Sequence, residues 1–99
     1  MILVMNEKVR NFEAWKSIFD AGEALRTRHG CTGHVIYRSD DAANDLTIQL
    51  QFPSRKAADA FIADPDLAAN RKRAGVETDP VVRHLHEAET ALYRSSRAA

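Results

Sequence analysis

Hydrophobic and polar positions follow two successive rounds of strand, helix and strand along this chain of 99 residues. Strand-like alternation and helix-like periodicity take turns over residues 2–5, 12–25, 34–38, 46–52, 57–74 and 81–88. This order predicts an α+β fold, the ferredoxin-like βαββαβ arrangement, in which four antiparallel strands form one sheet and both helices cover the same face. We expect one domain over residues 1–88, because a chain of this length buries one modest core, and a C-terminal tail over residues 89–99.

The two helical segments have a clear apolar side and clear boundaries. In the first, five residues share one arc of the helical wheel: Phe12, Trp15, Ile18, Phe19 and Leu25. Gly22 falls on the same arc, so we expect a continuous helix whose backbone approaches the sheet closely there, and Gly30 can adopt the left-handed conformation that ends it. In the second segment, Pro65 predicts a division into two pieces.

The first strand is apolar on both of its faces, with Ile2 and Val4 on one side and Leu3 and Met5 on the other. Helices can cover only one face of the sheet, so the second apolar face predicts a homodimer in which two sheets pack together. The alternative is a monomer that exposes a few apolar side chains, which is common among soluble proteins.

Composition and charge narrow the set of partners. Lysine and arginine number 14, and aspartate and glutamate also number 14, so there is no excess charge for nucleic acid or an anionic membrane. The basic clusters at residues 26–28 and 71–73 lie near predicted helix ends, where solvated cations complement the helix dipole. No apolar run approaches the length of a membrane span, and residues 1–5 are too short for a signal-peptide core, so we expect a soluble cytoplasmic protein. The single cysteine, Cys31, excludes an internal disulfide and a thiolate metal cluster.

Five features of the sequence carry a family resemblance: VRNFEAWKSIFD after the first strand, the spaced glycines Gly30 and Gly33, YRSDDAAND, FPSRKAADAFIADPDL and RAGVETDPVVRHL. Together they resemble the antibiotic biosynthesis monooxygenase-like group of dimeric α+β barrel proteins, and in particular its small cyclase-like members, from Met1 to about Glu89. The resemblance implies a ferredoxin-like dimeric barrel. The superfamily includes cofactor-independent oxygenases, haem-degrading enzymes, small dehalogenating and isomerising enzymes and proteins without an assigned activity, so it implies the fold more strongly than the reaction.

The haem-degrading branch of this superfamily is disfavoured. Its members resemble one another in an asparagine on the first strand, a tryptophan, and a haem-ligating histidine on the second helical segment. Asn6 can match the first of these, but Trp15 lies on the other helix and no histidine occurs between Phe52 and Arg83. We therefore expect no haem and no other cofactor.

In the oxygenases that this chain resembles, the substrate lies between the sheet and the helices of one subunit, in a pocket lined by aromatic and a few polar side chains. The resemblance thus implies a substrate pocket lined by Trp15, Phe19 and Phe61, although amphipathic helices also carry such residues as plain core. Tyr37 on the second strand offers a phenol to a substrate carbonyl or phenolate, and Asn6 offers a polar contact at the pocket mouth. A structural tyrosine and a turn asparagine are the simpler alternatives.

Histidines are natural candidates for a general base, because their unperturbed pKa is close to neutral. His84 and His86 share one face of the last predicted strand, and two such ligands without a third do not predict a metal site. The second and fourth strands lie at opposite edges of the predicted sheet, so His34 can approach this pair only across a dimer. We therefore expect a histidine cluster near the subunit seam, where His84 or His86 acts as a base or simply makes interface hydrogen bonds.

Three functions are compatible with these features. The leading hypothesis is a small cofactor-independent monooxygenase-like enzyme that acts on an aromatic or carbonyl small molecule. It deprotonates an electron-rich phenolic or quinol substrate, and the resulting carbanion reduces oxygen directly. The alternatives are a non-catalytic protein that binds a small molecule in the same pocket and a dimeric interaction module without a pocket. The sequence contains no glycine-rich phosphate loop, nucleophile elbow or DNA-reading helix signature.

Overall fold

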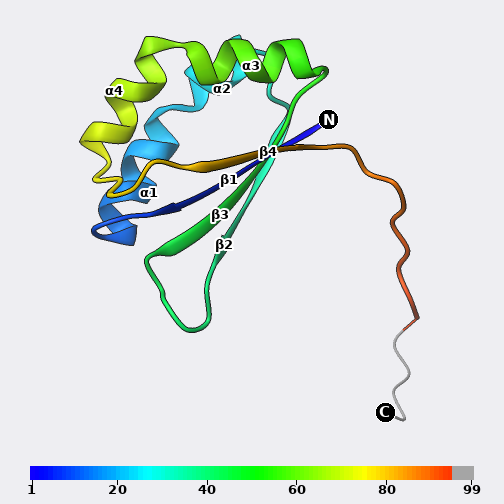
Figure 1. Cartoon of the computed structure of the whole chain (residues 1–99), viewed down its shortest axis with the longest axis horizontal. Coiled ribbons are helices and arrows are strands. Elements are labelled where there is room, and N and C mark those ends of the chain that lie inside the picture. The colour runs from blue at the N-terminus through cyan, green and yellow to red at the C-terminus, as the bar shows by residue number, and fades with distance from the viewer. Residues whose placement is uncertain (95–99) are drawn as a thin grey trace.

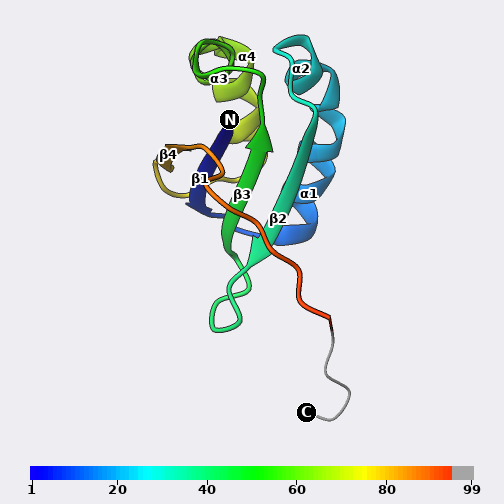
Figure 2. The same cartoon turned by 90° about the vertical axis from the view of Figure 1, so that its right-hand side faces the viewer.

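The computed structural model describes residues 1–94 of the chain. Its elements are β1 (Ile2–Lys8), α1 (Phe12–Ala21), α2 (Glu23–Arg28), β2 (Gly33–Arg38), β3 (Asp45–Gln51), α3 (Arg55–Ala63), α4 (Pro65–Arg73) and β4 (Val81–Leu85). The strands pair antiparallel in the order β2-β3-β1-β4, and the helices lie on one side of this sheet (Figure 1). Figure 2 shows the helices as two pairs, α1 with α2 and α3 with α4. The predicted ferredoxin-like α+β fold is thereby confirmed.

Strand alternation decides which side chains form the core. On β1 and β3 every second residue points toward the helices, and the register places five of these side by side: Leu3, Met5, Leu46, Ile48 and Leu50. All five are buried, and Trp15 of α1 and Phe61 of α3 cover them from the helix layer. Burial of one such side chain contributes about 1.5–3 kcal/mol, so the contact between sheet and helices is the main source of stability.

The first helical segment is divided at Gly22, and the prediction of one continuous helix is wrong. α1 ends there because the Gly22 N–H bonds to the carbonyls of Ile18 and Phe19, and α2 begins at the next residue. The buried Arg26 stabilises the division: its Nη1 donates to the Phe19 carbonyl at 2.6 Å, and its guanidinium stacks 3.8 Å from the centre of the Phe19 ring. A Cβ atom on Gly22 would lie 3.6 Å from Asn70 Nδ2, so the close approach is to α4 and not to the sheet.

The second helical segment is divided at Pro65, as predicted. Pro65 is the first residue of α4, and Asp64 is its N-cap, with a side-chain oxygen that accepts a hydrogen bond from the Asp66 N–H at 2.9 Å. Ser54 caps α3 in the same way, through the N–H of Ala57 at 3.1 Å. Each half of the sheet thus carries short helices, and within residues 1–94 no helix has the length and apolar character needed to cross a membrane.

β4 ends at Leu85, earlier than the predicted limit at residue 88. Leu85 pairs with Ile2, which is the first residue of β1, so no partner strand remains to extend the ladder. Residues 86–94 then leave the body of the fold with exposed side chains, and Leu92 is 94% exposed (Figure 1). They include the start of the predicted tail, whose remaining residues, 95–99, lie outside the described residues.

The sheet face opposite the helices carries apolar side chains at both of its edges. Val35 and Tyr37 of β2 and Val81 and Leu85 of β4 are all exposed, and the register places them on the face that the helices leave open. We predict the homodimer through this face, because a second sheet is the natural cover for it. The homodimer itself stays a prediction.

Candidate functional site

A cavity lies between the sheet and the two helix pairs, over β1 and β3. Its wall is mostly apolar and includes Met5, Ile18, Ile48 and Leu67. The three aromatic residues predicted to line a pocket, Trp15, Phe19 and Phe61, all border this cavity. The rings of Trp15 and Phe19 stack with their centroids 4.9 Å apart. The structure therefore brings these three residues together, while their contact with a substrate stays a prediction.

The volume of the cavity is small for an aromatic ligand. The space open to the centres of water molecules is about 60 Å³, which is enough for several waters. Benzene binds in a cavity of about 150 Å³, so an aromatic ring requires the wall to move. α4 is the part of the wall most able to move, because none of its residues from Pro65 to Arg73 is fully buried.

One end of the cavity contains a buried carboxylate, that of Glu7. β1 extends beyond its predicted end at Met5, and Glu7 takes the next inward position, where it is only 3% exposed. Burial raises the pKa of Glu7 above its ordinary value, and the charge of Arg71 and a hydrogen bond with Trp15 counteract this rise in part. Glu7 was not predicted, because the strand was expected to end before it. An acidic residue that continues the inward alternation of an apolar strand is the signal that identifies it.

Arg71 of α4 borders the same end of the cavity from the helix layer. Its Nε lies 3.8 Å from Glu7 Oε1, which is close enough for an ion pair and too long for a hydrogen bond. This Nε is buried and has no hydrogen-bond partner within residues 1–94, while Nη2 donates to the Thr78 carbonyl at 3.4 Å. The expectation that residues 71–73 are simply solvated is therefore wrong for Arg71. The helical phase turns it inward, and Lys72 and Arg73 remain exposed.

His84 and His86, the predicted bases, do not border this cavity. His84 lies on the helix side of β4, where its Nε2 is 2.9 Å from Asp59 Oδ1 of α3. His86 follows the end of β4 and is exposed, so the strand face that the two histidines were expected to share does not extend that far. Within residues 1–94, no three His, Cys, Asp or Glu side chains gather in a way that could hold a metal ion. A role for these histidines at a subunit seam stays a prediction.

His34 lies on β2, at the opposite edge of the sheet from β4, as predicted. Its ring meets the ring of Phe19 edge-on, with the centroids 4.9 Å apart, outside the residues that border the cavity. Partial burial lowers the pKa of His34, and the charges of Arg26 and Lys16 lower it further. The structure thus favours a neutral His34 imidazole that packs against the ring of Phe19.

Tyr37 and Asn6 lie on the other face of the sheet, away from the cavity. Tyr37 is 51% exposed, and the register places both residues beside Thr47. The Asn6 side-chain amide donates to Asp45 Oδ1 at 3.1 Å and to the Leu46 carbonyl at 2.9 Å, which ties β1 to β3. The expected position of Asn6 at a pocket mouth is therefore corrected. Alternate residues of a strand point to opposite sides, and these two have the outward phase.

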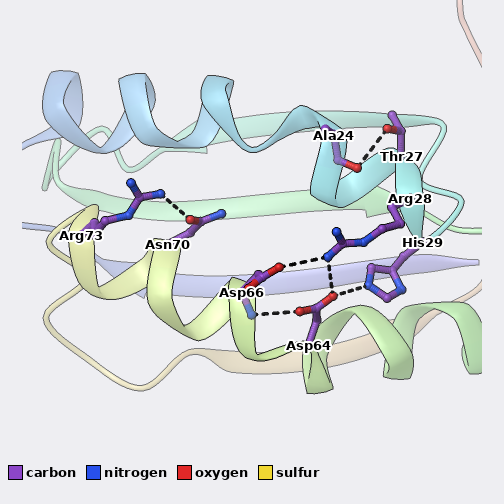
Figure 3. A network of polar contacts seen from close by, with 8 residues as sticks. All are labelled: Ala24, Thr27, Arg28, His29, Asp64, Asp66, Asn70 and Arg73. Carbon is purple, nitrogen blue, oxygen red and sulfur yellow. Dashed lines mark hydrogen bonds and ion pairs between the residues drawn. The ribbon is translucent and has the colours of Figure 1, made fainter.

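A network of polar contacts joins the two helix pairs (Figure 3). Asp64, between α3 and α4, accepts hydrogen bonds from Arg28 Nη2 and His29 Nε2 at the end of α2, each at 2.8 Å. Asp66 makes a longer contact with Arg28, at 3.3 Å. The hydrogen bond from His29 is the largest of the effects that lower the pKa of Asp64 to about 2. The network therefore holds the helix pairs together while Asp64 is ionised.

Comparison with known proteins gives a consistent answer about the fold. Neither the family models nor the curated proteins match this sequence. Among solved structures, a candidate antibiotic biosynthesis monooxygenase from Bordetella bronchiseptica matches with a TM-score of 0.75 at 18% identity, over 89% of this chain and 96% of that one. The cofactor-independent oxygenase SnoaB from Streptomyces nogalater matches with a TM-score of 0.68 at 17% identity, over 87% and 92% of the two chains. A monooxygenase from Streptomyces coelicolor in complex with the ligand nanaomycin D has a TM-score of 0.68 at 17% identity, over 94% and 91%.

The chain has the antibiotic biosynthesis monooxygenase fold. The resemblance drawn from the sequence is thus confirmed for the architecture. At identities of 17% and 18%, the reaction has to be argued from the cavity. Within this monooxygenase fold, Glu7, Arg71 and Trp15 meet around one space, and that space is the candidate functional site.

Proposed function

We propose that this protein is a small cofactor-independent monooxygenase-like enzyme that acts on an aromatic or carbonyl compound in the cavity between the sheet and the helices. The observation that carries the proposal is the buried carboxylate of Glu7 at one end of an apolar cavity walled by Trp15 and Phe19. The fold shared with a cofactor-independent oxygenase supports it. A homodimer that covers the open sheet face is part of the same proposal.

In this reaction the protein contributes a base and a site sheltered from water. Glu7 accepts a proton from an electron-rich substrate, and burial shifts its pKa upward, in the direction that makes a carboxylate a better base near neutral pH. The substrate carbanion passes electrons to O₂ and forms a peroxide. The peroxide takes up a proton and then loses water, which leaves C=O where the substrate had CH₂. One substrate molecule and one O₂ thus give one ketone and one water. Arg71 stabilises the negative charge that develops on a substrate oxygen.

Oxygen consumption by the chelator-treated protein tests this proposal, with a panel of aromatic ketones and quinols that carry an acidic C–H or O–H group. We expect catalysed oxygen uptake with at least one of them, and a fall in kcat of about 10²–10⁴-fold in Glu7→Gln, which is the usual contribution of a general base. Glu13→Gln is the matched control, because Glu13 is an exposed acid on α1, and it keeps the full rate. Uptake that Glu7→Gln leaves unchanged contradicts the proposal.

A non-catalytic small-molecule-binding protein that uses the same cavity, or a dimeric interaction protein, is the second candidate, and the small volume of the cavity favours the interaction protein. A space of about 60 Å³ holds several waters, and an aromatic ring needs more room than that. A binding protein would show saturable ligand binding without oxygen uptake or product. An interaction protein would bind none of the panel.

A further inference from the structure

We propose that a hollow between α2 and the start of β2 is a binding site for a small carboxylate. About 100 Å³ of this α2–β2 hollow is open to the centres of water molecules, and the residues that border it include Glu23, Arg26, Cys31 and His34. A space of this size holds a group of a few heavy atoms, such as acetate. The inference concerns a second site beside the cavity, so it goes beyond the proposed oxygenase reaction and does not depend on it.

Arg26 places a buried positive charge at the α2–β2 hollow. The residue is only 6% exposed, and within residues 1–94 it forms no ion pair. Asp20 and Glu23 act on its charge only from a distance. Buried cations are almost always paired with an anion, because burial removes the water that stabilises their charge. An anionic ligand would therefore supply the partner that the described chain lacks.

The guanidinium of Arg26 also has hydrogen-bond donors that remain free. Arginine carries several N–H donors, and within residues 1–94 Arg26 uses the one from Nη1, which donates to the Phe19 carbonyl at 2.6 Å. Arg71 Nε is the one fully enclosed side-chain polar atom without a partner in this part of the chain, so Nε and Nη2 of Arg26 keep contact with solvent. Stacking of the guanidinium 3.8 Å from the centre of the Phe19 ring fixes its plane. A ligand can therefore bind its free edge without movement of Arg26.

The surroundings of Arg26 favour a carboxylate with a single charge. The edge of a planar guanidinium presents paired donors that match the two oxygens of a carboxylate. Glu23 is exposed at the rim of the hollow, and its negative charge disfavours the second charge that phosphate would bring. Arg26 also borders the cavity, but the wall of the cavity is mostly apolar and suits an ion less well than the hollow does.

Acetate and acetamide are the probes that test this site, because they share a shape and only acetate is charged. We titrate the full chain with each probe, replacing chloride so that the ionic strength stays constant. The readouts are the His34 pKa from NMR, which a negative charge in the hollow raises, and the fluorescence of Trp15, whose ring stacks 4.9 Å from that of Phe19. We expect saturable acetate binding with a millimolar Kd, and acetamide binding about tenfold or more weakly.

Glu23→Gln tests the charge balance of the hollow without a change in the interior, because Glu23 is exposed. Removal of its negative charge relieves the repulsion of the ligand, and we expect acetate to bind about threefold more tightly. Glu13→Gln is the matched control, since Glu13 is an exposed acid on α1 that does not border the hollow, and we expect it to leave acetate affinity unchanged.

Arg26→Lys tests the paired donors directly. It keeps the positive charge and loses the planar edge, so we expect acetate affinity to fall about tenfold. Arg38→Lys is the matched control, because Arg38 also stacks on a phenylalanine ring, that of Phe12 at 3.9 Å, and lies outside the hollow. We expect Arg38→Lys to bind acetate as the wild type does.

The absence of a saturable response up to about 0.1 M acetate overturns the proposal, because a site of this kind binds in the millimolar range. Equal affinity for acetamide removes the role of charge, and tighter binding of phosphate removes the preference for a single charge, so either result overturns it too. Unchanged acetate affinity in a folded Arg26→Lys does the same. If that variant fails to fold, unchanged affinity in Glu23→Gln is sufficient to overturn the proposal.

Discussion

Phe61 belongs both to the core between the helices and the sheet and to the wall of the cavity. Truncation of this side chain therefore tests both parts of the structure at once. It is 2% exposed, borders the cavity and packs on Phe52 with the ring centroids 5.3 Å apart. Truncation of a buried phenylalanine to alanine costs about 3–5 kcal/mol. Phe61 borders the cavity, so its truncation loses fewer packing contacts than truncation at a fully packed site, and we expect the lower end of this range, about 3 kcal/mol, for Phe61→Ala.

Urea unfolding followed by circular dichroism measures this loss. A change of about 3 kcal/mol lowers the melting temperature of a domain of this size by about 12–24 °C. It still leaves the variant folded if the stability of the wild type is in the usual range of about 5–15 kcal/mol. Phe12→Ala is the matched control, because Phe12 is a half-buried ring on α1 that does not border the cavity, and we expect it to cost about 1–2 kcal/mol.

Phe61→Ala has a second expected consequence, because the space left by the Phe61 ring joins the cavity. Benzene binds in cavities of about 150 Å³, so we expect Phe61→Ala to gain benzene binding, seen as a rise in melting temperature with the ligand, while Phe12→Ala does not. A destabilisation below about 1 kcal/mol would refute the burial of Phe61 between α3 and the sheet. Normal destabilisation without a gain in benzene binding would refute the continuity of its site with the cavity.

Four further perturbations have expected outcomes. The pKa of Asp64 is lowered to about 2, so its hydrogen bonds stabilise the fold above the ordinary aspartate pKa and are lost as the pH falls through about 2. We expect the difference in the free energy of unfolding between the wild type and Asp64→Asn to shrink over that pH window in acid titrations of unfolding. The pKa of Glu7 is raised, so we expect the wild type to lose stability relative to Glu7→Gln as the pH rises above the ordinary glutamate pKa. The same pH dependence of urea unfolding in the two proteins would contradict the burial of this charge. Gly30 has φ +88°, and an added Cβ would lie 3.2 Å from Pro53, so we expect Gly30→Ala to cost about 1–3 kcal/mol in the same assay. Val35→Asp places a charge on the open sheet face, and we expect it to convert the predicted dimer into a monomer in sedimentation; a monomeric wild type would refute the dimer.

The fold could be predicted because its periodicities are strong and local. The alternation of Leu46, Ile48 and Leu50 identifies the core side of β3 directly, and Pro65 marks the division of the second helical segment. The division at Gly22 could not be predicted in the same way. A glycine inside a helix costs only about 1 kcal/mol, and the contact of Arg26 with the Phe19 carbonyl that favours the break is visible only in three dimensions.

The candidate site could be predicted only where it follows from the periodicity of one element. Trp15 and Phe61 border the cavity because they lie on the apolar sides of their helices. The pairing of Glu7 with Arg71 joins a strand and a helix that are distant in the sequence, and it depends on how α4 is rotated against the sheet. Histidine is a suitable general base, but the residue type does not determine which groups surround its side chain. In the structure His84 contacts Asp59 of α3 and does not border the cavity.

Stability alone does not explain the position of Glu7. A carboxylate at an inward strand position loses its hydration on folding, and the raised pKa is the expression of that loss. Arg71 compensates only in part, because a separation of 3.8 Å without a hydrogen bond satisfies neither group fully. An apolar residue there would continue the packing that Leu3 and Met5 begin on the same strand face. Groups that lower stability where they border a cavity are typical of sites selected for binding or catalysis, so the burial of Glu7 argues that this cavity receives a ligand.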